Sequence, residues 1–155
     1  MALLTTSLKT PVGTLHLVAD EHVLLRTSFE EIDLNSADVK RVKSIPVISD
    51  LIADYFDGDI EAISAITVRQ VGPKFSQSAW KAMRKIKAGK VLSYADLAKR
   101  AGSADAVRAA GSACAKNAIA VVVPCHRIVK TGGALGNYAY GLEVKEWLLR
   151  HEGAL

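Results

Sequence analysis

Strand-like segments come first in this chain and helix-like segments follow, and this order limits the fold more than any other feature of the sequence. Three β-favourable runs lie within residues 3–8, 14–19 and 23–29, with turn residues between them. Helical spacing of apolar residues begins only after Pro46 and dominates beyond residue 74. Because the two kinds of segment are separated rather than alternating, we predict an α+β fold.

The rest of the N-terminal half is predicted to supply one helix and one more strand. Residues 30–45 are polar and mixed, and we expect them to form a loop. Pro46 suits the first turn of a helix and Gly58 suits its end. The predicted apolar face of this helix comprises Val47, Leu51 and Tyr55. Residues 62–68 are predicted to form the further strand.

Charge divides the chain near its middle. Residues 1–73 carry 6 Lys/Arg and 11 Asp/Glu, a net charge of −5, whereas residues 74–155 carry 14 and 5, a net charge of +9. Residues 69–74 are predicted to be a linker, so we expect one domain over 1–70 and a second over 74–155. This asymmetry indicates that the second domain binds a polyanion, although a solvated basic surface explains the charge equally well.

The basic half is predicted to open with three helices. The first ends near Gly89 and has Phe75, Ala79, Met83 and Ile86 on one face. Ser93 and Asp96 fit a capping box that opens a short helix to about Ala101. Ser103 is expected to cap a third helix over residues 104–115. Two short helices joined by a Gly-containing turn are typical of a helix-turn-helix, which in a basic domain indicates DNA binding.

The end of the chain combines a buried segment, a loop and a last helix. Residues 119–123 form a continuous apolar run, predicted to be a buried strand that ends at Pro124. Residues 131–133, Thr-Gly-Gly, are predicted to be a loop. The last helix is expected over residues 143–151, with Val144, Trp147 and Leu148 facing inward.

Composition excludes several classes of protein. The chain is 50% apolar and 23% charged, which suits a globular protein with a hydrophobic core and excludes a disordered chain. No apolar run approaches the roughly 18 residues of a membrane span, and the N-terminus does not resemble a secretion signal. With only Cys114 and Cys125, we expect no structural disulfide and a reducing compartment: the cytoplasm, or the nucleus in a eukaryote.

The most informative tetrapeptide is Pro-Cys-His-Arg at residues 124–127. A cysteine that follows a buried segment in a basic region can have a lowered pKa and act as a thiolate nucleophile. A lone cysteine is more often a small buried hydrophobe, which is the interpretation we give to Cys114. Neighbouring side chains of an extended chain point in opposite directions, so Cys125 and His126 are expected to touch only if the chain turns; a water could bridge them.

Several further motifs occur in an order that identifies a family. They are Pro-Cys-His-Arg-Ile-Val at 124–129, Asn117 eight residues before the cysteine, Arg-Ala-Ala-Gly at 108–111, Ser-Tyr-Ala-Asp-Leu-Ala at 93–98, and Val-Lys-Glu-Trp-Leu-Leu-Arg-His-Glu-Gly at 144–153. On these motifs the chain resembles the O6-alkylguanine-DNA alkyltransferases, also called methylated-DNA–protein-cysteine methyltransferases. The resemblance is strong from Phe75 onward, whereas the N-terminal half matches only in outline, through residues 10–15.

The resemblance implies a fold and a reaction. The expected fold is an N-terminal sheet and helix of ribonuclease H-like type, followed by a mainly helical, winged-helix-like domain that binds DNA. The expected reaction moves the alkyl group of O6-alkylguanine, and also of O4-methylthymine, from double-stranded DNA to Cys125 after the base is flipped out of the duplex. The product is a thioether that nothing in these motifs could cleave, so each molecule is expected to act once and as a monomer, without a cofactor. Some relatives hold zinc with N-terminal Cys and His, but residues 1–73 contain no Cys and we expect no metal.

The resemblance also implies roles for individual residues. The expected catalytic set is Cys125 as nucleophile, His126 and Glu152 as a relay that removes the thiol proton through a water, Tyr94 as hydrogen-bond donor to guanine N3, and Asn117 as part of the polar network. The expected DNA contacts are Arg108, which occupies the space left by the flipped base, together with Ala109, Ser93 and Arg127. The expected pocket residues are Ile128, Tyr138, Ala139 and Tyr140. The Ile128 and Cys125 carbonyls would accept from the exocyclic amine, and the Ala139 amide would face O6.

Alternatives remain open from the residues alone. Each of these side chains, taken singly, also fits an ordinary structural role. A non-catalytic winged-helix regulator explains the charge and the helix pair but leaves Pro-Cys-His-Arg unexplained. A cysteine hydrolase explains Cys125 and His126 but predicts turnover and no stable alkylated protein. Tyr140 is expected to exclude bulky alkyl groups, although an aromatic wall could instead stack on a benzyl ring.

Overall fold

The computed structural model describes residues 3–34 and 38–155, and the chain forms two compact units. The first unit contains the chain up to Gln70 together with Ala118–Val122, and the second contains Val71–Asn117 and Val123–Leu155. The division at Gln70 falls in the segment predicted to be a linker. The return of Ala118–Val122 to the first unit was not predicted, because nothing local in an apolar run identifies the core into which it packs.

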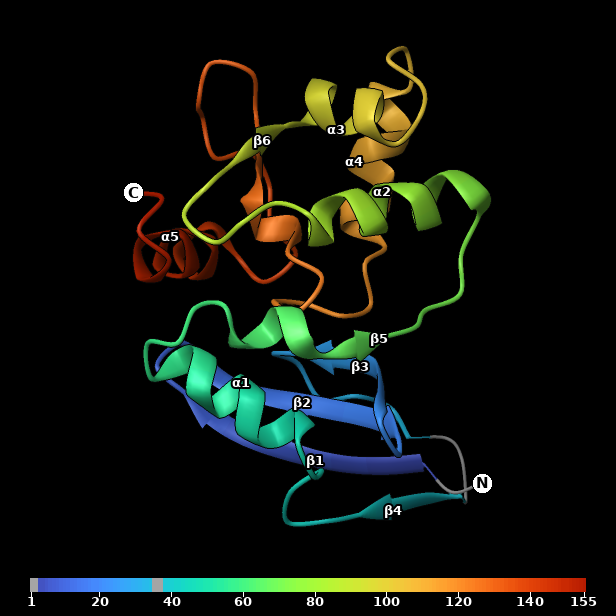
Figure 1. Cartoon of the computed structure of the whole chain (residues 1–155), viewed down its shortest axis with the longest axis vertical. Coiled ribbons are helices and arrows are strands. Elements are labelled where there is room, and N and C mark those ends of the chain that lie inside the picture. The colour runs from blue at the N-terminus through green and yellow to red at the C-terminus, as the bar shows by residue number, and fades with distance from the viewer. Residues whose placement is uncertain (1–2, 35–37) are drawn as a thin grey trace. The chain divides into compact units, whose positions relative to one another are not determined.

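The first unit is built on a five-stranded sheet in the order β4-β1-β2-β3-β5 (Figure 1). The three predicted strands are confirmed as β1 (Leu3–Thr10), β2 (Gly13–Asp20) and β3 (Val23–Ser28), which pair antiparallel. Alternate residues of β2 face the core, so that Leu15, Leu17 and Ala19 are fully buried. Gly13 closes the β1–β2 turn with a φ of 122°, a conformation that favours glycine.

Two edge segments of the sheet differ from the prediction. The expected loop over residues 30–45 contains β4 (Val39–Arg41), which pairs parallel to β1. The expected strand over residues 62–68 is instead a 3₁₀ helix, η1 (Ala62–Ala65), followed by the short strand β5 (Thr67–Val68) beside β3. A short apolar run fits a buried strand or a buried helical turn equally well, so the pattern alone did not distinguish them. In the structure, Ala62 and Ile63 are buried within the 3₁₀ helix.

The predicted helix after Pro46 is confirmed as α1 (Ile48–Phe56), but of its predicted apolar face only Tyr55 is fully buried. Ile48, Ile52 and Tyr55 are buried, whereas Val47 is 61% exposed and was wrongly placed in the core. Val47 has a φ of 68°, so it precedes the helix in a turn and does not share the helical periodicity.

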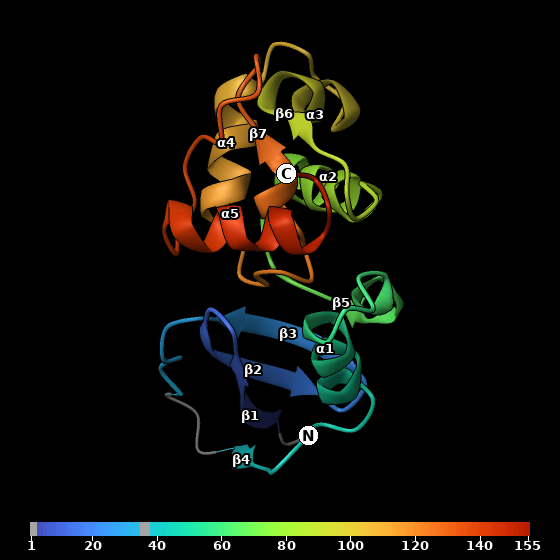
Figure 2. The same cartoon turned by 90° about the vertical axis from the view of Figure 1, so that its left-hand side faces the viewer.

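The second unit is mainly helical. Its elements are α2 (Lys74–Arg84), β6 (Leu92–Ser93), α3 (Tyr94–Arg100), α4 (Val107–Ala115), η2 (Cys125–Arg127), β7 (Ile128–Val129) and α5 (Leu142–His151). The strands β6 and β7 lie side by side and parallel (Figure 2). This pairing brings the start of α3 next to the residues that follow Cys125, although 31 residues separate Tyr94 from Cys125 in the sequence.

Of the two predicted serine caps in this unit, the one on α3 is present and the one on α4 is not. Ser93 caps α3 as predicted, with its Oγ accepting from the Asp96 amide at 3.0 Å. Ser103 does not cap α4, which begins three residues later than expected, at Val107. The Ser103 carbonyl instead accepts from the Ala106 amide in the turn between the two helices.

The apolar run at residues 119–123 is buried but is not a strand. Only Ile119 forms a bridge, to Thr27 of β3, and the following residues turn, with Val121 at a φ of 71°. The Thr27 hydroxyl donates to the Ala120 carbonyl, which satisfies a buried group inside this turn. The continuous hydrophobicity therefore reflects burial on all sides and not strand pairing.

The last helix is confirmed, with a different inward face from the one predicted. Lys145, Leu148 and Leu149 are buried, whereas Val144 and Trp147 are only partly covered. No helix in the described part of the chain is long and apolar enough to cross a membrane. Among the same residues, no group of three or more His, Cys, Asp or Glu side chains is placed to hold a metal ion.

Candidate active site

Cys125 begins a single 3₁₀ turn, η2, directly after the buried 118–123 segment. The turn points consecutive side chains in different directions, which resolves the question left open by the sequence. Cys125 lines a cavity, while His126 and Arg127 are directed into the protein and reach Glu152. The side chains of Cys125 and His126 therefore lie in different surroundings although the two residues are neighbours in the sequence.

Asn117 lies just beyond the end of α4 and holds the nucleophile. Its Nδ2 donates to the Val123 carbonyl at 2.8 Å and to the Cys125 Sγ at 3.3 Å. Burial raises the pKa of the Cys125 thiol, while the Asn117 hydrogen bond and the charge of Lys145 act in the opposite direction. The thiol is therefore largely protonated at rest and needs a base, and Asn117 stabilises the thiolate once it forms.

A buried network connects His126 and Arg127 to Glu152, the residue after α5. Arg127 donates from Nε to Glu152 Oε1 at 2.8 Å and from a terminal nitrogen to Oε2 at 2.9 Å, and His126 Nε2 lies 2.8 Å from Oε2. Burial alone would raise the pKa of Glu152, but its contacts with His126 and Arg127 outweigh burial and lower this pKa to about 2. Glu152 is therefore a carboxylate at neutral pH and accepts every one of these hydrogen bonds.

Burial determines the protonation state of His126, and the charge of Glu152 determines its tautomer. Burial lowers the pKa of the ring, so it is neutral near pH 7 even though Glu152 acts in the opposite direction. A carboxylate only accepts, so His126 must carry its proton on Nε2, and Nδ1 keeps a lone pair. Nδ1 is buried and has no hydrogen-bond partner among residues 3–34 and 38–155. This atom is able to accept a hydrogen bond or a proton.

Arg127 was predicted to contact DNA, and the structure places it elsewhere. It is only 5% exposed, and its remaining terminal nitrogen donates to the Ile86 carbonyl at 2.6 Å. The guanidinium nitrogens therefore all donate to groups inside the protein, and the guanidinium charge balances the buried carboxylate of Glu152. Arg127 acts as the counter-ion of Glu152 and is not a surface phosphate contact.

Cys125 faces a cavity of about 440 Å³, within the size range of small-molecule sites. The residues that line the cavity are Tyr94, Gly111, Cys114, Ala115, Cys125, Lys130, Asn137, Tyr138 and Ala139. The wall formed by α4 consists of small residues, and a side chain at Gly111 would meet no other atom within 4 Å, so the space there is open. The cavity is therefore large enough for a flat ring beside the thiol.

Tyr94 reaches the cavity from the first position of α3. Burial, followed by the nearby thiols of Cys114 and Cys125, raises the pKa of its hydroxyl, which therefore stays protonated and can donate. Gly136 allows this position, because a Cβ there would lie 3.2 Å from the Tyr94 ring and hydroxyl. Gly136 also has a φ of 75°, so any other residue would be strained as well as crowded.

Lys145 is a second buried cation near the nucleophile, and the motif analysis gave it no role. Its side chain is fully buried, and Nζ donates to the Ile128 carbonyl at 2.6 Å and to the Asn137 carbonyl at 3.1 Å. The ammonium therefore links Ile128, in β7, to Asn137, which lines the cavity. Burial lowers the pKa of Lys145, while the Cys125 and Cys114 thiols raise it.

Two of the predicted pocket residues do not line the cavity. The Ile128 side chain is fully buried and its carbonyl accepts from Lys145, which satisfies the group expected to bind the exocyclic amine. Tyr140 packs edge-on against Tyr138, with ring centroids 5.6 Å apart, and so contacts a residue that lines the cavity. Tyr138 and Ala139 do line the cavity.

The predicted DNA contacts lie in different environments on the helix pair. Arg108 is exposed in the first turn of α4, whereas Ala109 is half-buried beside it. Ser93 is half-buried, and its hydroxyl caps α3. Arg108 presents a positively charged side chain to solvent in the first turn of α4.

Sequence reasoning missed two residues beside the nucleophile. Cys114 was interpreted as structural, yet it lines the cavity, and burial followed by the proximity of Cys125 raises the pKa of its thiol to about 12. Lys145 stands three and four residues before the buried Leu148 and Leu149, which places a charge on the apolar face of a helix. That spacing was the signal that could have found it.

Comparison with known proteins agrees with this geometry. Residues 74–154 match the family described as 6-O-methylguanine DNA methyltransferase, DNA binding domain. The chain is 38% identical to the methylated-DNA–protein-cysteine methyltransferase of Salmonella typhimurium over 168 aligned residues, covering 100% of this chain and 98% of that protein.

Solved structures give the same result for the fold. The crystal structure of Mycobacterium tuberculosis O6-methylguanine methyltransferase matches with a TM-score of 0.84 and 28% identity, covering 98% of this chain and 93% of that one. The Mycobacterium tuberculosis OGT in complex with DNA matches with a TM-score of 0.85 and 29% identity, covering 96% of this chain and 92% of that one. The chain therefore belongs to the methylated-DNA–protein-cysteine methyltransferase family.

Proposed function

We propose that this protein repairs DNA by moving an alkyl group from O6 of guanine to Sγ of Cys125. The observation that carries the proposal is the thiol itself, which lines a cavity of about 440 Å³ and accepts a hydrogen bond from Asn117. The names of the relatives describe this same transfer to a cysteine. A target base reaches such a cavity only when it is flipped out of the duplex.

The neutral His126 removes the thiol proton. Nδ1 carries the free lone pair, and a water passes the proton from Sγ to it. Glu152 then stabilises the imidazolium through Nε2, at 2.8 Å, while Arg127 keeps Glu152 ionised. His126 thus supplies the base that the Cys125 thiol requires, because burial raises the pKa of this thiol.

The transfer is an in-line displacement at the alkyl carbon. The new bond joins Sγ to that carbon, and the bond between the carbon and O6 breaks with its electron pair leaving on guanine. Tyr94, which stays protonated, donates a hydrogen bond to guanine N3 and stabilises the developing negative charge. The product thioether remains on Cys125, so each molecule acts once.

DNA approaches through the helix pair of the second unit. Arg108, exposed at the first turn of α4, fills the space left by the flipped base, and the helix lies in the minor groove. The α3–α4 pair with the β6–β7 ladder supports a winged-helix-like domain, and the sheet with α1 supports a ribonuclease H-like one. We extend the proposal to O4-methylthymine as a second substrate, to a monomer, and to a cytoplasmic or, in a eukaryote, nuclear location.

Intact-mass measurement after incubation with duplex DNA containing O6-methylguanine tests the function. Transfer predicts one persistent added methyl per molecule, with peptide mapping placing it on Cys125. Cys125→Ser should remain unmodified, whereas the matched variant Cys114→Ser, in the same cavity, should still accept the methyl group. No mass change would favour a non-catalytic regulator, and repeated turnover without a stable adduct would favour a hydrolase. Label on Cys114 would refute the assignment of the nucleophile.

A further inference from the structure

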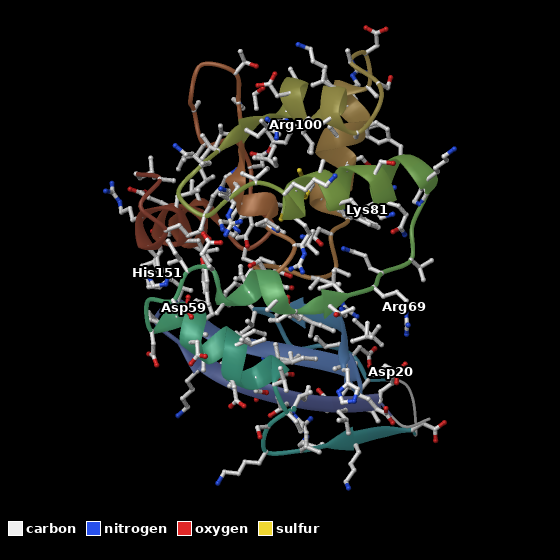
Figure 3. The ribbon with its side chains drawn as sticks, in the orientation of Figure 1. Asp20, Asp59, Arg69, Lys81, Arg100 and His151 are labelled. Atoms are coloured by element: carbon white, nitrogen blue, oxygen red, sulfur yellow. The ribbon has the colours of Figure 1, made fainter. Side chains whose placement is uncertain are left out.

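A basic depression on the second unit is separate from the alkyl-transfer cavity. It has a volume of about 400 Å³ and is lined by Ser78, Lys81, Ala82, Lys85 and Arg100. The first four residues repeat at helical spacing along α2 and its C-terminal cap, and Arg100 ends α3, which packs on α2. Lys81 and Arg100 project from these neighbouring helices in Figure 3. The depression shares no residue with the cavity of Cys125.

The three cations of this depression have no carboxylate partner within 4.0 Å among the described residues. Elsewhere, exposed arginines do pair, as Arg69 does with Asp20 and Arg150 with Glu146. Residues 74–90 contain six Lys/Arg and no Asp or Glu, so α2 offers no acid of its own. Asp96 stands one helical turn before Arg100 but forms no ion pair with it.

Two explanations compete for such a cluster. Cations near the C-terminal ends of α2 and α3 interact favourably with the helix dipoles, which would make them purely stabilising. Gathering three like charges around one hollow is unfavourable, however, unless an anion enters it. A hollow that also carries the Ser78 hydroxyl offers a phosphate both charge and a neutral hydrogen-bond donor.

We propose that this depression binds a backbone phosphate of DNA, outside the part of the duplex that delivers the damaged base. The proposal rests on DNA binding by this unit but not on alkyl transfer. Lys81, Lys85 and Arg100 supply charge that is independent of base sequence, so the contact adds affinity for any duplex and does not select the lesion. The site would hold the protein on undamaged DNA while bases are tested.

The salt dependence of binding to undamaged duplex tests the proposal. Each lost phosphate contact lowers the magnitude of the slope of log affinity against log salt by about 0.9, so the triple variant Lys81→Gln, Lys85→Gln, Arg100→Gln, which removes the contact with one phosphate, should lower it by about 1. At about 0.1 M salt, affinity should fall by about tenfold. Fluorescence anisotropy with duplexes of about one and two helical turns measures both quantities.

A matched control separates a site from general charge. Lys9, Lys40 and Lys43 are exposed in the acidic unit, and their triple substitution by Gln removes the same charge. An equal decrease in the slope for both triple variants would overturn the proposal. A slope unchanged from the original protein, with only a lower unfolding temperature, would assign the three cations to the helix dipoles and overturn it as well.

Two further measurements distinguish the remaining outcomes. If inorganic phosphate displaces the duplex more strongly than chloride at equal ionic strength, and only when the three cations are present, the duplex occupies this site through a phosphate, as proposed. If inorganic phosphate binds to the three cations without displacing the duplex, the site binds free phosphate and the proposal is wrong. Transfer from free O6-benzylguanine should be unchanged in the triple variant, because the cavity of Cys125 is untouched. If duplex DNA containing O6-methylguanine never alkylates even the unsubstituted protein, the proposed function fails while the slope still decides the phosphate site.

Discussion

Replacing Glu152 by Gln would test whether one buried carboxylate supports both the stability and the chemistry of the second unit. Glu152 is 3% exposed and accepts from Arg127 at 2.8 and 2.9 Å while lying 2.8 Å from His126. Gln has nearly the same shape, but its NH₂ group places a donor where two donors converge. It also leaves the Arg127 guanidinium without a counter-ion in a buried position.

Two independent arguments give a similar loss in the free energy of unfolding for Glu152→Gln. Removing one partner of a buried ion pair typically destabilises a protein by about 3–5 kcal/mol. The pKa of Glu152 is lowered from its ordinary value of 4.5 to about 2, and a shift of this size corresponds to about 3 kcal/mol of stability. Because the folded-state pKa is depressed, this stability is present above pH 4.5 and is lost as the pH falls toward 2. Glu152→Gln should remove it at every pH.

Urea unfolding at several pH values measures this effect. At pH 7, Glu152→Gln should lower the free energy of unfolding by about 3–5 kcal/mol and the unfolding temperature by about 6–20 °C. The difference from the original protein should shrink as the pH falls below 4.5. Glu146→Gln is the matched control, because its pair with Arg150 is exposed and contributes at most about 1 kcal/mol.

Two results would refute this reasoning. A loss below about 1 kcal/mol at pH 7, equal to that of Glu146→Gln, would mean that Arg127 finds another partner. A difference that does not change between pH 7 and pH 3 would mean that the carboxylate of Glu152 is not the group that titrates. Alkyl transfer from free base should also slow in Glu152→Gln, and an unchanged rate would remove Glu152 from the proton relay.

Three further changes probe the cavity and the DNA surface. Arg108→Ala should slow repair of duplex DNA more than reaction with free base, since only the duplex must be held open; equal losses in a comparison of the two rates would contradict its role. Lys145→Met should move the pH–rate profile of transfer to higher pH, because the charge that lowers the pKa of Cys125 is gone; a profile that stays in place would limit Lys145 to holding the Ile128 and Asn137 carbonyls. Tyr140→Gly should raise the ratio of benzyl to methyl transfer rates by about tenfold to a hundredfold, because it frees the Tyr138 ring to move; a constant or lower ratio shows that Tyr140 does not limit substrate size.

Much of the site was predictable because its signals are local. The capping of α3 by Ser93 depends on residues three apart, and it is confirmed. Cys125 was predicted as the nucleophile from one tetrapeptide, and Asn117 was assigned from the motif of the family that the chain resembles. The predicted start of α4 was wrong because the Ser103 carbonyl accepts from the Ala106 amide within a turn, and residues 103–106 form that turn before the helix begins.

Contacts between distant segments could not be predicted in this way. The sequence places Arg127 in a basic stretch, where a DNA contact is the natural interpretation, but the end of α5 brings Glu152 to it across 25 residues. The run at 119–123 has the composition of a strand, yet its polar groups are satisfied by Thr27 from a separate sheet.

The sequence by itself determined the order of strands and helices, the division of charge and the reactive tetrapeptide, because periodicity, capping and spacing act over a few residues. Only the tertiary structure decided that Arg127 faces inward, that Lys145 links the Ile128 and Asn137 carbonyls, and that Nδ1 of His126 has no partner among the described residues. The first two follow from burial: a charged group removed from water must find a partner, and the fold determines which distant residue supplies it.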